Sequence, residues 1–303
     1  MNLLASITIG INPYIFNTGR FILSWHGFLT FVAVAMAVYL VVRWGTKEGL
    51  NGDAIYSVSV WAIIGGIIGA RLVHVIDRWG DVYRYNPISI IYIWQGGIAI
   101  YGAILGGFVG GSLYILIRNS NWFLALWGRL FRFLGEPAKA PLPGIGHLAD
   151  ITAPALLIAM AIGRVGDIIN GEHFAKATSL PWGVIYTHPE SPGLDRPATH
   201  PAVAYELLFD LALVGIFWPL RNRLRPHGML FTLYLAAYSA GRFFLSFLRQ
   251  EDKVYFLGLQ EAQIIALIVM LITIPLLVYK AQLVRPATRR AAPRNTARRG
   301  ESR

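Results

Sequence analysis

Seven apolar stretches divide this 303-residue chain, and each is long enough to cross the roughly 30 Å of hydrocarbon in a bilayer. They lie at Phe21–Trp44, Ala54–Ile76, Ile88–Ile117, Leu148–Ile169, Ala202–Leu220, Met229–Leu248 and Ala262–Tyr279. Only 14% of the residues are charged, against about a quarter in a soluble domain. We therefore predict an all-α integral membrane protein, with about seven transmembrane helices within residues 1–280. Gly96 and Gly97 near the start of the third stretch predict that this helix begins with a broken or re-entrant segment.

The basic residues between the stretches predict the orientation of the chain. Most of them fall on one side, at Arg43, Lys47, residues 118–139, residues 221–225 and the segment from Lys280 onward. Because cytoplasmic loops carry the excess of Lys and Arg, we expect the N-terminus outside and the C-terminus in the cytoplasm. Residues 281–303 are predicted to be a basic, disordered tail near anionic lipid, and no nucleic-acid partner is expected. Turn-forming residues predict a small external cap at 172–200.

Three arginines, Arg71, Arg164 and Arg242, lie inside the predicted spans. An arginine in hydrocarbon costs at least about 2.5–3.5 kcal/mol, so it normally faces a partner or a wet cavity. One interpretation is internal pairing with the four acids in or at the ends of spans, which are Asp150, Asp167, Glu206 and Asp210. The other is an anion pocket, because guanidinium groups match phosphate oxygens and stay charged when buried. Lipid head groups are the main anions at this depth, so this second interpretation favours a phospholipid substrate.

Helical spacing places polar residues on the same faces as two of these arginines. Arg164, Asp167 and Asn170 or Gly171 share one face of the fourth span, and Tyr238 lies one turn before Arg242. Glycines at 65, 66 and 69 and at 102, 106 and 110 predict close contact between helices. The seven histidines do not cluster at ligand spacing, so no metal site is expected.

Five blocks along the chain, from about residue 20 to residue 280, resemble the prolipoprotein diacylglyceryl transferase family. They are GGIIGARLVHV, WQGGIAIYGAILGG, GRVGDIINGE, HPAVAYE and YSAGRFFLSFLRQED. The resemblance implies an enzyme of the bacterial cytoplasmic (inner) membrane that needs no cofactor. Such an enzyme transfers the diacylglyceryl group of phosphatidylglycerol to the lipobox cysteine of prolipoprotein signal peptides and releases sn-glycerol 1-phosphate. The chain has no cysteine, which is consistent with a substrate that supplies the thiol.

The resemblance also implies roles for individual residues. Arg164 and Arg242 match two essential arginines and would bind the phosphate as catalytic residues, and Tyr238 matches a tyrosine near them. The other expected substrate-binding positions are Asp167, Asn170, Gly171, Glu172 and Arg71. Glu172 would pair with or orient an arginine. The role of Arg71 is divided between a substrate contact and a structural one.

The sequence departs from the family pattern at four positions. His26 stands where some members carry a tyrosine, and Tyr101 stands where the same members carry a histidine proposed as the base. His26 would then be the base with Tyr101 as its hydrogen-bond partner; alternatively, neither is a base and the arginines alone lower the thiol pKa. Asp167 replaces an asparagine, and would either weaken Arg164 or accept the thiol proton. Ser246 replaces a glutamate, which leaves Arg242 without that partner on its own helix.

Two rival functions remain open at this stage. An organic-anion or lipid transporter would also hold arginines in the membrane, although no internal repeat is visible. A lipid-binding paralogue that has lost transfer would keep the fold and is suggested by Asp167, Tyr101 and Ser246.

Overall fold

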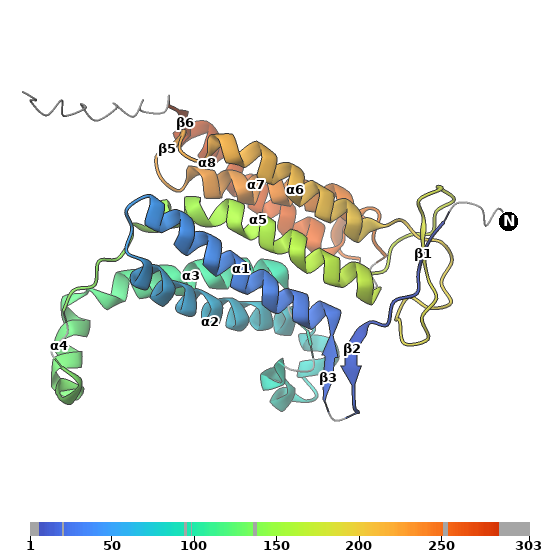
Figure 1. The fold of residues 1–303 in the computed structure, drawn as a ribbon, viewed down its shortest axis with the longest axis horizontal. Helices are drawn as coiled ribbons and strands as arrows, with labels where there is room; N and C mark the ends of the chain where they lie inside the picture. The colour runs from blue at the N-terminus through green and yellow to red at the C-terminus, as the bar shows by residue number, and fades with distance from the viewer. Residues whose placement is uncertain are drawn as a thin grey trace, which may run out of the picture.

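The computed structural model describes residues 6–19, 21–93, 96–97, 99–135, 138–250 and 254–284. Its long helices are α1 (Trp25–Lys47), α2 (Gly52–Asp77), α3 (Ile100–Arg118), α5 (Ile145–Asn170), α6 (Ala202–Leu220), α7 (Met229–Ser246) and α8 (Glu261–Lys280). They run side by side in one bundle (Figure 1). Within the described residues six of them, all but α7, are long and apolar enough to cross a membrane. The helical membrane fold is confirmed, whereas the count of seven spans stays a prediction.

The helices begin at residues that can satisfy free backbone N–H groups. The side chain of Ser24 accepts the N–H of Gly27 at the start of α1, and that of Asn51 accepts the N–H of Ala54 at the start of α2. Residues 21–24, which were predicted to open the first span, instead contain strand β3 (Ile22–Ser24). The predicted tail lies outside the described residues from position 285 onward.

The third apolar stretch is broken at its start, as predicted. Pro87–Ile91 form a short 3₁₀ helix, and α3 begins only at Ile100. Between them Gly96 and Gly97 have φ of 83° and 77°, a left-handed conformation that favours glycine. The stretch from residue 88 therefore contributes a shorter helix than its apolar length suggested.

Helices α2 and α3 pack with their main chains in contact. A Cβ atom added to Gly65 would collide with the carbonyl oxygen of Gly106, and one on Gly69 would collide with that of Gly102. This confirms the packing role predicted for these glycines, because only residues without a Cβ let two backbones come so close.

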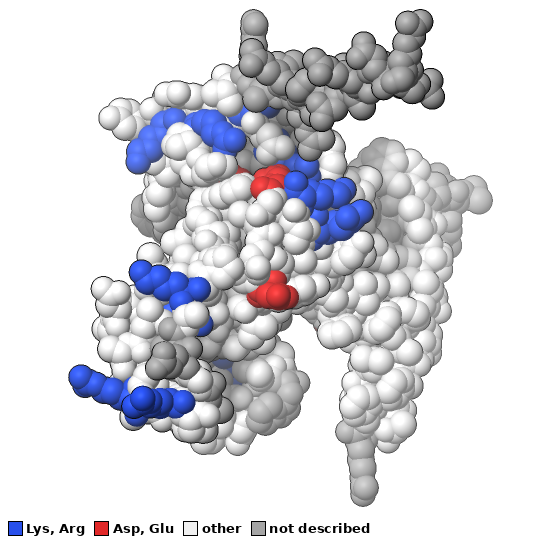
Figure 2. Space-filling model, turned by 60° about the vertical axis from the view of Figure 1, so that its left-hand side comes forward, with Lys and Arg blue, Asp and Glu red and all other residues white. Residues whose placement is uncertain are grey.

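One α-helix among the described residues was not predicted. Helix α4 (Asn121–Leu130) extends away from the bundle at the end where α1 and α3 finish (Figure 1). It is too short to span a bilayer, and it carries Trp122 and Leu126 exposed beside Arg129. Viewed from this end, the molecule shows more Lys and Arg than Asp and Glu on its surface (Figure 2).

Strands β1 to β4 and the chain between α5 and α6 lie at the opposite end of the bundle. Strand β1 (Ile7–Ile9) pairs in parallel with β4 (Val184–Tyr186), with Ile7 opposite Val184. Strand β2 (Tyr14–Asn17) forms an antiparallel hairpin with β3, and β5 (Leu224–Arg225) pairs with β6 (Gln282–Leu283) at the α4 end. We call residues 172–200 the cap segment. The N-terminal strand is thus tied to it (Figure 1).

Helix α5 forms the centre of the bundle and contacts α1, α6 and α7. Its Ala153 and Leu157 are fully buried with Phe217 of α6 and Tyr234 of α7. On its other side α5 packs against α1 and α2. Polar groups near the cap end of α5 therefore face neighbouring helices.

Candidate functional site

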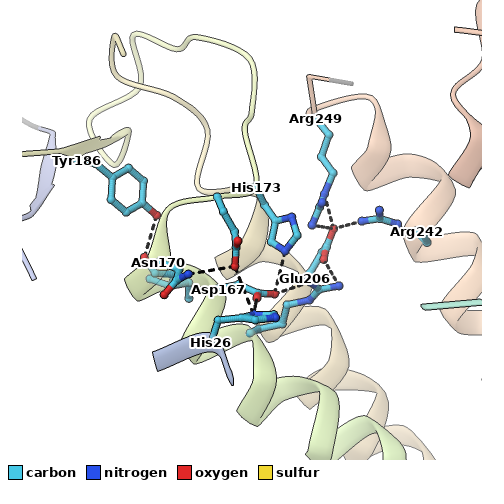
Figure 3. A network of polar contacts seen from close by, with 11 residues as sticks. His26, Asp167, Asn170, His173, Tyr186, Glu206, Arg242 and Arg249 are labelled. Atoms are coloured by element: carbon cyan, nitrogen blue, oxygen red, sulfur yellow. Dashed lines mark hydrogen bonds and ion pairs between the residues drawn. The ribbon is translucent and has the colours of Figure 1, made fainter. Parts of the chain in front are cut away.

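One buried carboxylate, that of Glu206 on α6, binds three arginines (Figure 3). Arg164 of α5 contacts Oε2 through Nη2 at 2.7 Å, and Arg242 of α7 contacts Oε1 through Nη1 at 2.5 Å. Arg249, three residues beyond the end of α7, contacts Oε1 through Nε and Nη2, both at 2.8 Å. Glu206 is 5% exposed. We call these four residues the arginine cluster.

Guanidinium groups outnumber carboxylates among the described residues at the arginine cluster. Three guanidinium groups are in direct contact with two carboxylates, those of Glu206 and Asp167. Such a concentration of donors suits a phosphodiester, which carries a single negative charge. Guanidinium forks also offer the paired N–H groups that phosphate oxygens accept.

Asp167 joins Arg164 to His26. Its Oδ2 accepts from Nη1 of Arg164 at 2.7 Å, and its Oδ1 lies 2.5 Å from Nδ1 of His26. His173 reaches the same carboxylate from the cap segment, with Nε2 at 3.4 Å from Oδ2 (Figure 3). A carboxylate at Nδ1 holds a neutral imidazole in the tautomer with its proton on Nδ1, so Nε2 is left to accept a proton.

Gly166 makes the contact between α1 and α5 possible. A Cβ at this position would lie 2.9 Å from Cα of His26 and 3.0 Å from the carbonyl oxygen of Trp25. Both distances are too short for a side chain, so glycine is needed for the start of α1 to rest on α5. This contact places His26 against Asp167, the residue after Gly166.

The end of α5 is shaped by Gly171, which has φ of 73°. Its N–H donates to the carbonyl oxygen of Asp167 at 3.0 Å. A Cβ here would lie 2.7 Å from Oγ of Ser191 and 2.8 Å from the ring of Tyr186. Burial raises the pKa of Tyr186 to about 12, and its hydroxyl donates to the carbonyl oxygen of Ile168 at 2.9 Å. Gly171 therefore lets the cap segment pack on α5.

Asn170 and Glu172 lie on the cap side of Asp167. The Asn170 amide donates to Oε1 of Glu172 at 3.2 Å, and that oxygen is 3.5 Å from Nδ1 of His26. Among the described residues Oδ1 of the buried Asn170 has no hydrogen-bond partner. Glu172 contacts His26 rather than one of the arginines of the cluster.

The two tyrosines expected at the site contact each other. The rings of Tyr101 on α3 and Tyr238 on α7 are 6.2 Å apart, and Tyr238 also stacks on Tyr234. In the described part of the chain no hydrogen bond joins Tyr101 to His26, whose partner is Asp167. The hydroxyl of Tyr238 is buried without a hydrogen-bond partner among these residues.

Arg71 lies apart from the arginine cluster and binds neutral oxygens. Among the described residues its guanidinium group donates to main-chain carbonyls of the segment before α3, those of Ser89, Ile90, Tyr92, Gly96 and Gly97, at 2.6–3.4 Å. It also lies over the ring of Tyr83, 5.3 Å from the centroid. These contacts support the structural alternative for Arg71.

The four acids of the spans behave differently. Glu206 and Asp167 pair with arginines, as the pairing interpretation expected. Asp150 instead accepts the N–H groups of Gly228 and Phe231, at 2.8 and 3.0 Å, where α7 begins. Asp210 is 1% exposed, and its Oδ2 has no hydrogen-bond partner among the described residues.

Three side chains at the site lie close enough together to be ligands of one metal ion. One ligand atom each of His26, Asp167 and Glu172 lies within 4.8 Å of the other two. The guanidinium group of Arg164 contacts the same Asp167 carboxylate at 2.7 Å, which disfavours a divalent cation there. The expectation of no metal stays a prediction.

Sequence reasoning missed two members of the site, His173 and Arg249. Glu206 was expected as one of four acids that could pair with the arginines, but not as the shared partner of three of them. His173 was not considered. Arg249 was counted as a loop residue, although it is 5% exposed and follows Arg242 by seven residues, two helical turns. Ser246 donates to the carbonyl oxygen of Arg242, whose carboxylate partner comes from α6.

The comparisons with known proteins cover nearly the whole chain. The prolipoprotein diacylglyceryl transferase family profile matches residues 13–132 and 142–279. A phosphatidylglycerol–prolipoprotein diacylglyceryl transferase of Dehalococcoides mccartyi (strain ATCC BAA-2100 / JCM 16839 / KCTC 5957 / BAV1) is 33% identical over 274 residues, which cover 90% of this chain and 95% of that protein. A protein of the same name from Staphylococcus aureus (strain JH9) is 31% identical over 278 residues, 89% of each chain.

Proposed function

The chain belongs to the prolipoprotein diacylglyceryl transferase family, and we propose how its own residues carry out the family's reaction. The protein is a membrane transferase that moves the diacylglyceryl group of phosphatidylglycerol to a prolipoprotein. The acceptor is the thiol of the lipobox cysteine in the signal peptide. A carbon–sulfur bond forms at the glycerol carbon, the carbon–oxygen bond to phosphate breaks, and its electron pair leaves with the phosphate as sn-glycerol 1-phosphate.

The arginine cluster is the observation that carries the assignment of the phosphate site. Negative charge grows on the phosphate oxygens as the carbon–oxygen bond breaks, so donors fixed around those oxygens lower the barrier. Arg164 and Arg242 are held from two different helices by one carboxylate of Glu206. This carboxylate occupies the position of an anion between them. The phosphate of the lipid displaces some of the contacts that this carboxylate makes, and its oxygens accept hydrogen bonds from the guanidinium groups instead.

His26 is the base that accepts the thiol proton. A thiol with a pKa near 8.5 needs deprotonation before it attacks, and a histidine is suited to this near neutral pH. Asp167 fixes the tautomer of His26 and stabilises the imidazolium that forms. Tyr101 holds Tyr238 in place through the contact between their rings, and it does not assist His26 as a hydrogen-bond partner.

Substrates would reach the site near the cap segment, in the outer half of the bacterial cytoplasmic membrane. Arg164, Asp167 and Arg242 all lie in the halves of their helices that end near this segment. In this proposal Tyr238 contacts the lipid phosphate. Asn170 accepts from a head-group hydroxyl through Oδ1, which has no hydrogen-bond partner among the described residues. The N-terminus is outside and the C-terminus is in the cytoplasm, consistent with the basic surface at the α4 end.

A direct assay tests this function against its rivals. The purified protein in lipid nanodiscs is incubated with phosphatidylglycerol and a lipobox peptide, and mass spectrometry follows the peptide. We expect a mass gain of one diacylglyceryl group, and no gain on a peptide whose cysteine is replaced by serine. If the cysteine peptide gains no mass, the protein is not an active transferase. Flux of glycerol phosphate across liposomes without peptide modification would instead support a transporter.

A further inference from the structure

A polar cavity adjoins the arginine cluster on the side of the cap segment. Its volume is about 370 Å³, within the roughly 300–1,000 Å³ typical of small-molecule sites. The side chains that line it and matter here are Arg78, Glu172, His173, Arg196, Arg249 and Gln250. Arg249 belongs to both the cluster and the cavity, whereas Arg164 and Arg242 are not among the residues that line the cavity.

The cavity and the arginine cluster share a wall. Arg249 lines the cavity while its Nε and Nη2 contact Glu206. His173 and Glu172 also line it, and they lie 3.4 Å from Asp167 and 3.5 Å from His26 (Figure 3). An anion released at the cluster would therefore meet this cavity directly.

The lining is suited to a small, strongly charged anion. Among the described residues that line the cavity, three are arginines and one is a glutamate. The guanidinium group of Arg196 lies over the ring of Phe174, with Cζ 3.4 Å from the centroid, and in the described part of the chain it makes no ion pair. Stacking uses the face of a guanidinium group and leaves the N–H groups on its edge for an acceptor. Arg78, which also lines the cavity, pairs with Asp77, with Nε 3.0 Å from Oδ2.

The chemistry of the proposed reaction requires such a place. When the carbon–oxygen bond breaks, the diacylglyceryl part stays with the peptide and the bilayer. The other product carries a phosphate monoester and two hydroxyl groups, so it is soluble only in water. We propose that the cavity lined by Arg78, Arg196 and Arg249 binds the glycerol phosphate part of the lipid and is the route by which this product leaves. This inference rests on the proposed function.

Arg196→Gln tests the inference, with Arg84→Gln as its control. Arg84 is exposed at the same end of the molecule and does not line the cavity. Binding of sn-glycerol 1-phosphate to each protein in nanodiscs is measured by titration calorimetry, which needs no turnover. Loss of one charge-assisted contact should weaken binding about tenfold in Arg196→Gln. Arg84→Gln should bind within about twofold of the wild type, and Arg196→Lys should recover part of the loss.

Kinetics then separate the two sources of the glycerol phosphate group. If the cavity serves the free product, Arg196→Gln raises its inhibition constant about tenfold and leaves KM for phosphatidylglycerol unchanged. If it also holds the head group of the intact lipid, both constants rise together. Equal binding by the wild type and by a folded Arg196→Gln protein would overturn the inference. Binding without any transfer would leave the cavity assigned and reject the transferase function, and transfer without binding would do the reverse.

Discussion

Arg71 and the arginine cluster are two ways of holding charge inside the same bundle. Arg71 donates to carbonyl oxygens of one short segment, and these neutral groups are fixed parts of the chain. Arg164 and Arg242 bind a carboxylate, which is itself an anion on a side chain. A phosphate can compete with a carboxylate for the guanidinium donors. At Arg71 a phosphate would instead have to displace main-chain carbonyls, which would then be left without hydrogen bonds. A buried arginine is therefore a sign of function when its partner is an exchangeable anion.

The largest effect is expected for the arginines that face the phosphate. Arg164→Gln or Arg242→Gln should lower kcat about 100- to 1,000-fold, because a fixed donor to the leaving phosphate is lost. Transfer to the lipobox peptide is measured after circular dichroism has shown the variant to be helical. Activity within about threefold of the wild type in a folded variant would show that the cluster, like Arg71, has a structural role and does not bind the phosphate.

Replacing the histidine or its partner should have the next largest effect. We expect His26→Gln to lower kcat about 100-fold at neutral pH, as is typical for loss of a general base, and higher pH should restore part of it. Asp167→Asn should lower it about tenfold, and adding it to His26→Gln should cost little more. The pH profiles of the single and double variants check this coupling. A faster Asp167→Asn enzyme would show that this carboxylate restrains Arg164 instead.

Removing the charge of Glu206 sharpens the idea that it occupies the place of an anion. Glu206→Gln leaves three guanidinium groups without their shared carboxylate, which should destabilise the protein by about 3–5 kcal/mol. Added phosphatidylglycerol should then raise Tm more in the variant than in the wild type. Thermal unfolding in nanodiscs with and without this lipid measures both effects. Equal shifts in the two proteins would contradict the exchange.

The smallest effect on catalysis is expected at Arg71. Arg71→Lys loses several donors to the segment before α3, and each carbonyl left without a partner costs about 1–3 kcal/mol. Tm should fall, while kcat per folded molecule stays within about threefold because Arg71 does not touch the cluster. Folded protein is quantified by size-exclusion chromatography. A large loss of kcat without a change in Tm would assign Arg71 to the substrate.

The helices could be predicted from the sequence because apolar length sets where a chain crosses a bilayer. Ala202–Leu220 was predicted with the bounds that the structure has. Helix α4 was missed because its ten residues are too short for that signal. The broken start of the third stretch was predicted from Gly96 and Gly97, but the residue at which α3 begins was not, because apolar length does not report backbone turns.

The candidate site was only partly predictable for a different reason. Arg164 and Arg242 stood out because a charge in an apolar span is costly. The partner of His26 lies 141 residues away, and the pairing exists only because α1 packs on α5. Glu206 likewise becomes the centre of the cluster only when α5, α6 and α7 meet. Arg249 could have been found from its spacing of two helical turns after Arg242.

The close glycine contacts between α2 and α3 limit how the helices of the bundle can separate. Their backbones interlock at Gly65, Gly69, Gly102 and Gly106, so these two helices can swing only as one rigid unit. On the other side, α3 meets α7 through aromatic side chains, with Phe108 stacked on Phe231 at 5.5 Å. Ring stacks separate and re-form without breaking main-chain contacts. A two-tailed lipid would therefore enter between α3 and α7, along this aromatic face. Cross-linking α3 to α7 should block entry of the lipid, whereas cross-linking α2 to α3 should leave entry unaffected.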